Sequence, residues 1–210
     1  MSTFMACGVV DLHLGADPAP LLDEIVAAAR RQPLADVATR PLQVWSRSTD
    51  GGPRVSLMAE YGNAWLGQAL AIAVARHPVV RRAVLALDHD EYGAEHVVLA
   101  DVGGTLCRRQ HIYVYPDGEP EEDFGPILAD LPACGAAPVA PDGTINDAAS
   151  WSAVAALYDV PVEDVAAAGR YAVVAHEELG LIFTPFVPWW NAIRVPYPWD
   201  LGVPDAELLR

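Results

Sequence analysis

Residues 82–116 have the sequence RAVLALDHDEYGAEHVVLADVGGTLCRRQHIYVYP. Turn signals at Glu91–Ala94 and at Gly103-Gly104 divide this stretch into three runs that are rich in apolar and β-branched residues. We expect each run to be a strand, at about residues 83–90, 95–101 and 105–115. Because strands joined by tight turns pair in opposite directions, the stretch predicts a three-stranded antiparallel meander.

Upstream of the meander, helix and strand patterns alternate. Apolar residues recur at helical spacing within 17–32 and 63–77. Strands are expected at 3–14, 42–49 and 53–60, with the hairpin signal Asp50-Gly51-Gly52 between the last two. The order β-α-β-β-α-β-β-β favours an α+β fold in which a mixed or antiparallel sheet carries two helices on one face. The chain contains neither GxGxxG nor GxxxxGK[ST], which disfavours nucleotide-binding folds.

Acidic residues are concentrated in the second half of the chain. Residues 1–116 contain 12 Asp and Glu and 10 Arg, a net charge of −2, whereas residues 117–210 contain 16 Asp and Glu and 3 Arg, a net charge of −13. This asymmetry predicts an acidic helical C-terminal appendage after an α+β sheet domain at 1–116. We expect an acidic Pro/Gly-rich connector at 117–147, then a helical pair with a Pro/aromatic arm at 148–210, packed on the sheet domain.

The charge limits the classes of partner. An acidic surface repels nucleic-acid phosphates and anionic lipid headgroups, so direct binding to nucleic acid or to a membrane surface is disfavoured and a basic protein partner is favoured. All 13 basic residues are Arg, and Ala and Val are frequent, which is typical of a GC-rich bacterial genome.

The spacing of the cysteines and the lengths of the apolar stretches indicate the cellular compartment of the protein. Cys7, Cys107 and Cys134 are far apart and form no CxxC pair, so we expect no disulfide framework and a reducing cytoplasm. The N-terminus lacks a basic region, and no apolar stretch of about 18 residues is free of charge, so neither a signal peptide nor a membrane span is expected.

Three histidines of the meander form a candidate metal site. If both turns are tight, His89 faces His96 and His96 faces His111, with the Cβ atoms of opposed residues about 5 Å apart. Three imidazoles on one face could hold Zn²⁺ with an open position for water. The alternative is that these histidines line the solvated face of an antiparallel sheet, with no cofactor. A shift of one residue in either turn would separate the row.

Residues 151–171, WSAVAALYDVPVEDVAAAGRY, resemble a helix-turn-helix unit, including that of some antitoxins. The second helix of such a unit contacts DNA phosphates through Lys and Arg. Here it begins with Glu163 and Asp164 and offers only Arg170 as a base. We therefore favour an αα-hairpin used for packing.

The segment 183–199, FTPFVPWWNAIRVPYPW, is unusually rich in aromatic residues and proline. Such residues either pack in a core or anchor an interface. The candidate partner-binding residues are four aromatic residues of this arm and three acidic residues of the connector: Trp189, Trp190, Tyr197, Trp199, Glu121, Glu122 and Asp123.

The favoured functional hypothesis is a cytoplasmic bacterial protein-interaction module that binds a basic protein. Small acidic proteins that neutralise toxic nucleases offer an analogy. The first alternative is a small metal-dependent hydrolase built on the histidine row, in which the metal activates a water. The second alternative is a helix-turn-helix regulator. Taken together, the sequence features favour a non-enzymatic function.

Overall fold

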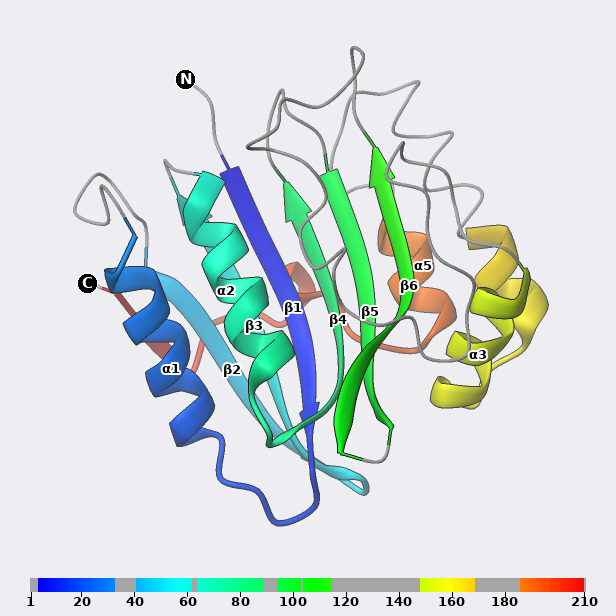
Figure 1. Ribbon diagram of the computed structural model, residues 1–210, viewed down its shortest axis with the longest axis horizontal. Coiled ribbons are helices and arrows are strands. Elements are labelled where there is room, and N and C mark those ends of the chain that lie inside the picture. Colours follow the sequence, from blue (N-terminus) through cyan, green and yellow to red (C-terminus); the bar gives the residue numbers. More distant parts are fainter. Residues whose placement is uncertain are drawn as a thin grey trace.

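The computed structural model describes residues 4–32, 41–61, 64–88, 94–102, 104–114, 148–168 and 186–209. Its centre is a seven-stranded antiparallel sheet in the order β6-β5-β4-β1-β3-β2-β7 (Figure 1). The strands are β1 (Phe4–Leu12), β2 (Leu42–Thr49), β3 (Gly52–Tyr61), β4 (Val80–Asp88), β5 (Ala94–Val102), β6 (Thr105–Val114) and β7 (Ala206–Leu208). The predicted α+β class and the antiparallel meander are confirmed.

The β2–β3 hairpin turns where the Asp-Gly-Gly signal predicts it. Thr49 pairs with Gly52, which leaves a two-residue connection. Gly52 has φ +122°, and a Cβ atom there would lie 2.7 Å from the carbonyl oxygen of Leu12. Only glycine tolerates both the positive φ and this close approach, so the turn signal has a steric basis.

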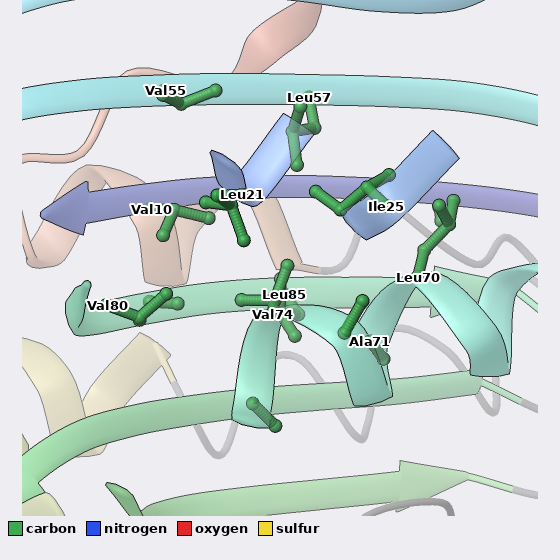
Figure 2. Close-up of a cluster of buried hydrophobic side chains, with 14 of the residues drawn as sticks. Val10, Leu21, Ile25, Val55, Leu57, Leu70, Ala71, Val74, Val80 and Leu85 are labelled. Atoms are coloured by element: carbon green, nitrogen blue, oxygen red, sulfur yellow. The ribbon is translucent and has the colours of Figure 1, made fainter. Parts of the chain in front are cut away.

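Two helices cover one face of the sheet, as predicted. They are α1 (Ala19–Arg30) and α2 (Ala64–Arg76), and both lie in front of the strands in Figure 1. Figure 2 shows Leu21 and Ile25 of α1 with Val74 of α2 against Val10 and Leu85 of the sheet. Each of these side chains is buried, so the apolar stripe of each helix packs against the sheet.

The C-terminal part of the chain covers the other face of the sheet. Its elements are α3 (Ala148–Tyr158), a helical segment at 162–168, α5 (Val187–Ala192) and a 3-10 turn, η4 (Pro198–Asp200). A second core forms here between the sheet and these elements: Cys7, Val9, Val84, Ala86, Ala94, Val98, Val154, Ala155, Val165, Ala168, Phe186, Trp189, Trp190, Ile193, Val195 and Tyr197. Because both faces of the central strands are covered, β4 is buried almost throughout rather than at alternate positions.

β7 lies at an edge of the sheet and has no counterpart in the predicted pattern. Its three residues pair with Leu42–Val44 of β2. Beside it, the Asp205 carboxylate accepts hydrogen bonds from the Ser46 amide at 2.7 Å and from an Arg47 Nη at 3.0 Å. The C-terminal segment therefore closes part of the β2 edge, a role that only its long-range pairing reveals.

The cysteines differ from the expectation of reduced thiols. Cys107 is disulfide-bonded, whereas Cys7 is free and buried in β1. Since stable disulfides are typical of oxidising compartments, Cys107 does not fit the expected reducing cytoplasm. No helix in the described part of the chain is long and apolar enough to cross a bilayer.

Candidate functional site

The predicted histidine row does not form. His96 pairs with Ala86 on β4 and with Ile112 on β6, while His111 pairs with Val97. A β-bulge beside Val98 adds a residue to β6, which moves His111 by one position relative to the predicted register. His89 lies outside the described residues. Among the residues that are described, no group of three His, Cys, Asp or Glu side chains could hold a metal ion. The hydrolase hypothesis requires His96 and His111 to be opposite each other, and in the structure they are not.

His96 is instead a buried member of an aromatic cluster. Its Nε2 accepts a hydrogen bond from the Trp190 indole N–H at 2.8 Å. The Phe186 ring is stacked on the imidazole, with centroids 4.6 Å apart, and the Trp189 ring meets it edge-on at the same distance. Because Nε2 accepts, it carries no proton, and the imidazole is not directed to solvent. The expectation of a solvated histidine face is wrong at His96, which is completely buried.

The four candidate aromatic residues of the arm divide between the core and the surface. Trp189, Trp190 and Tyr197 are buried, so the packing alternative holds for them. Trp199 is 56% exposed. The Trp190 ring contacts the edge of the Tyr197 ring at 5.2 Å, and the Tyr197 ring is stacked on Trp199 at 6.5 Å with an angle of 7°. The exposed indole therefore lies beside the buried rings of the second core.

The acidic candidates Glu121, Glu122 and Asp123 lie outside the described residues. In the region that resembles a helix-turn-helix unit, Val154 and Val165 are buried in the second core, while Glu163 is exposed. The helices at 148–158 and 162–168 therefore pack on the sheet through their apolar residues.

A hollow opens beside Trp199, at the end of the sheet where β1 begins. Its volume is about 190 Å³. The lining residues come from the strands and from the C-terminal segment: Met5, Pro41, Gln43, Met58, Glu60 and Trp199. We call it the Trp199 hollow. Met5 is directly opposite Glu60, and Met58 is directly opposite Gln43, so these four share one face of the sheet, which the C-terminal elements leave open there.

Acidic residues lie in and near the lining of the Trp199 hollow. Glu60 lines it, Asp88 is opposite Met5 on β4, and Asp200 follows Trp199 in the chain. Burial raises the pKa of the Tyr197 hydroxyl, and the Cys7 thiol beside it and the charges of Asp200 and Asp88 raise that pKa further.

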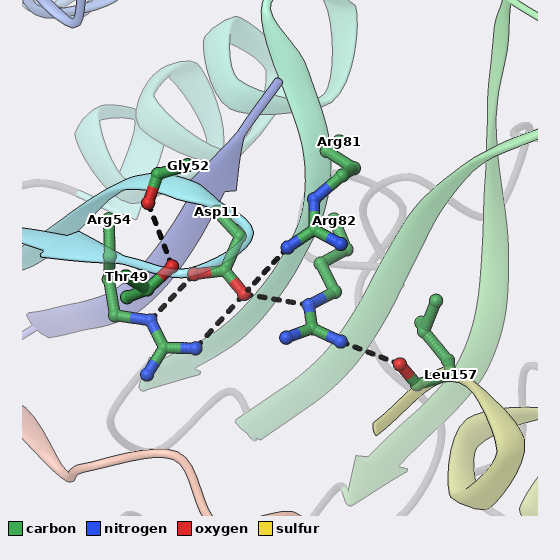
Figure 3. A network of polar contacts seen from close by, with 7 residues as sticks. All are labelled: Asp11, Thr49, Gly52, Arg54, Arg81, Arg82 and Leu157. Carbon is green, nitrogen blue, oxygen red and sulfur yellow. Dashed lines mark hydrogen bonds and ion pairs between the residues drawn. The ribbon is translucent and has the colours of Figure 1, made fainter. Parts of the chain in front are cut away.

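A second polar constellation lies at the opposite end of β1. The buried Asp11 carboxylate accepts hydrogen bonds from Arg54 at 2.6 and 3.0 Å and from Arg82 at 2.7 Å, and Arg81 lies 3.7 Å away (Figure 3). Arg82 also donates to the Leu157 carbonyl oxygen of α3 at 2.6 Å. We call these residues the Asp11 cluster. It links three strands to α3, so its evident role is structural.

The ionisation of Asp11 follows from these contacts. Burial opposes the charged form, but the hydrogen bonds and charges of Arg54 and Arg82 outweigh burial and hold the pKa of Asp11 below its usual value. The sequence analysis missed this cluster. Asp11 is opposite Arg54 on β3 and opposite Arg82 on β4. The cluster could have been predicted only if the order of the strands in the sheet had been known.

Cys7 offers no nucleophile. Burial raises the pKa of its thiol to about 12, so almost no thiolate is present near neutral pH. Comparison with family models, with curated proteins and with solved structures finds no significant match to the chain.

Proposed function

We propose that this chain is a protein-interaction module that binds a basic protein. The observation that carries the proposal is Trp199, an exposed indole beside a hollow with a carboxylate in its lining. Trp is among the residues that most often dominate binding energy at interfaces, especially where a pocket adjoins it. Exposed Trp side chains also cost little entropy to order when, as here, a second ring already supports them.

The charge of the whole chain supports the same class of partner. Its net charge of −15 at pH 7 attracts a basic surface over a distance and repels nucleic acid and anionic lipid. Such attraction accelerates association and is screened as salt rises. A role comparable to that of acidic proteins that neutralise basic toxins is the specific form of this proposal, and it rests on analogy.

The first experiment is affinity capture with three immobilised baits: the native chain, Trp199→Ala, and Leu14→Ala. Leu14 is the matched control because it is also an exposed large apolar residue, but lies just beyond the other end of β1. We expect a partner with an isoelectric point above about 9. It should bind the native and Leu14→Ala baits and be much reduced on Trp199→Ala.

The second experiment measures the association rate of that purified partner by stopped flow. Raising the ionic strength from about 0.01 M to 1 M shortens the Debye length from about 30 Å to 3 Å, so the rate should fall by at least about tenfold. An acidic or neutral partner, or an association rate that does not change with salt, would contradict the proposal.

A further inference from the structure

The Asp11 cluster carries more positive than negative charge. Three guanidinium groups converge on one carboxylate oxygen, Asp11 Oδ2. This oxygen lies 2.7 Å from Arg82 Nε, 3.0 Å from an Arg54 Nη and 3.7 Å from an Arg81 Nη. Three positive charges and one negative charge give the cluster a net charge of +2. The local excess is opposite in sign to the net charge of −15 of the whole chain.

The neighbouring ionisable groups leave this excess in place. Asp101 follows the residue that is opposite Arg82 on β5, but its carboxylate is paired with His13 Nε2 at 3.4 Å. Tyr158, whose ring centre is 4.2 Å from the Arg82 guanidinium, stays neutral because burial raises the pKa of its hydroxyl. Within the part of the chain that the structure describes, Asp11 is the one carboxylate that forms an ion pair with these arginines.

The cluster also has hydrogen-bond donors that Asp11 does not use. Arg54 donates to Asp11 through Nε and one Nη, and Arg82 donates through Nε to Asp11 and through one Nη to the Leu157 carbonyl oxygen. The second Nη of each has no partner among the described residues. The side chains of Arg54, Arg81 and Arg82 are 15%, 34% and 16% exposed, so a small solute can reach them.

Arg81 is the least committed of the three arginines. Its Nη is 3.7 Å from Asp11, which is too far for a hydrogen bond, and its Nε has no partner in the structure. A Cβ atom at Gly51 would lie 2.8 Å from an Arg81 Nη. The guanidinium therefore keeps its position over the β2–β3 turn only because residue 51 has no side chain. Figure 3 shows the Arg54 guanidinium on one side of the Asp11 carboxylate and those of Arg81 and Arg82 on the other.

The chemistry of these guanidinium groups suits a phosphate group. A phosphate monoester carries a charge of about −1.5 to −2 at pH 7, which matches the local excess. Its oxygens point in several directions, so guanidinium groups from different strands can donate to it together, whereas a planar carboxylate offers two oxygens in one plane. Because the rest of the chain is acidic, a long polyanion is repelled beyond the region of direct contact. A small phosphate is therefore favoured over nucleic acid.

We infer that the Asp11 cluster binds one phosphate group, either the free anion or a small monoester, through Arg81 and the unused Nη groups of Arg54 and Arg82. The phosphate lies on the solvent side of the guanidinium groups, while Asp11 holds Arg54 and Arg82 from within the sheet. The inference does not rest on the proposed function, which concerns the other end of β1.

The test titrates the full chain, labelled with ¹⁵N, with inorganic phosphate, capped phosphoserine and acetate at pH 7.5. Sodium chloride keeps the ionic strength constant, so that screening does not change during the titration. The probe is the backbone amide signal of Gly52, in the turn beside Arg81. We expect a saturable shift with phosphate and at least about tenfold weaker binding of acetate, a difference of about 1.4 kcal/mol. Phosphoserine that binds more tightly than phosphate identifies a monoester as the ligand, and the reverse order identifies the free anion.

Two variants distinguish a positioned site from a general effect of charge. Arg81→Gln leaves the hydrogen bonds of Asp11 in place and should lower the affinity for phosphate at least about tenfold. Gly51→Ala keeps every charge but displaces the Arg81 guanidinium, and should lower the affinity about 2- to 5-fold. The control is Arg30→Gln, which removes an exposed arginine of α1 on the other face of the sheet and should leave the affinity unchanged. Urea unfolding checks that each variant is folded.

Three results would overturn the inference: no saturable response to phosphate in the native chain, equal affinity for acetate and phosphate, or equal losses in Arg81→Gln and Arg30→Gln. The last result would show that the chain responds to net charge alone. None of them bears on the proposed function, which is tested by capture of a basic partner and by Trp199→Ala. Conversely, a chain that binds phosphate but captures no basic protein would refute the proposed function alone.

Discussion

At the scale of single residues, Asp11 shows how one side chain organises its surroundings. Its carboxylate is almost fully buried and lies within hydrogen-bond distance of Arg54 and Arg82. Burial of charge is tolerated only when partners satisfy it, and here two guanidinium groups do so. Tyr158 adds to the arrangement, because the guanidinium of Arg82 lies 4.2 Å from the centre of its ring.

Asp11→Asn should destabilise the fold strongly. The substitution leaves the partly buried Arg54 and Arg82 without their anion, a change that typically costs about 3–5 kcal/mol. Urea unfolding measures this as a change in the free energy of unfolding. The control is Asp23→Asn on the exposed side of α1, which should change it by less than about 0.5 kcal/mol. Equal effects of the two variants would mean that the Asp11 cluster contributes little.

Cys7 should be chemically inert in the folded chain. Burial raises the pKa of its thiol to about 12, so both access and thiolate formation are unfavourable. Iodoacetamide at pH 8, followed by mass spectrometry of the Cys7 peptide, should give almost no alkylation in buffer and rapid alkylation in denaturant. Alkylation within minutes in buffer would show that β1 opens readily.

At the scale of elements, α5 depends on its packing. A helix of six residues has almost no intrinsic stability. Its buried Trp189 and Trp190 hold it against His96. Its position therefore comes from tertiary contacts rather than from helical propensity.

Trp190→Phe tests the hydrogen bond that ties α5 to β5. Loss of the indole N–H leaves the buried His96 Nε2 without this donor, which should cost about 1–3 kcal/mol beyond the loss of ring volume. The same substitution in a His96→Phe background should cost less by that amount, because no acceptor remains. Thermal and urea unfolding of the four chains measure the difference. An identical cost in both backgrounds would show that only the volume of Trp190 matters.

Asp205→Ala tests the attachment of β7. The carboxylate accepts from the Ser46 amide, but it is about half exposed, so we expect a global loss of only about 0.5–1.5 kcal/mol. The local effect should be larger: hydrogen exchange of the Ser46 amide should accelerate much more than that of amides in β1. The exposed Asp23→Asn variant again serves as control. Unchanged exchange at Ser46 would show that β7 is held without Asp205.

At the scale of the whole molecule, the Asp11 cluster and the Trp199 hollow lie toward opposite ends of β1. The Asp11 cluster gathers three arginines around one carboxylate, whereas the lining of the Trp199 hollow includes Glu60 and no arginine. We therefore propose that a basic partner approaches the end of the sheet that carries Trp199, away from these arginines.

The stability of the chain should fall as the solution is acidified, in part through Asp11. Its pKa is lower in the folded state than the usual value of about 4, so the folded state binds fewer protons than the unfolded state. This contribution is complete above the unfolded pKa and is lost as the pH falls through the folded pKa. Urea unfolding between pH 7 and pH 3 should show the gap between the native chain and Asp11→Asn narrowing below about pH 4. A constant gap over that range would contradict the assignment.

Much of the fold is predictable from local patterns. The apolar runs, the Asp50-Gly51-Gly52 turn and the helical spacing identify β1 to β6, α1 and α2 within a few residues. The register was not predictable: one bulged residue in β6 separates His96 from His111. A single inserted residue costs little free energy at the bulge itself. Beyond the bulge, however, every residue of β6 is opposite a different residue of β5.

The sequence by itself determined the α+β class, the antiparallel meander, the two helices on one face and the acidic character of the chain, because each depends on spacing or composition within a short stretch. Only the tertiary structure decided what covers the second face, which aromatic residue of the arm stays exposed, and that Asp11 meets Arg54 and Arg82. Those outcomes depend on contacts between residues far apart in the chain, and burial free energy depends on which surfaces meet rather than on local pattern.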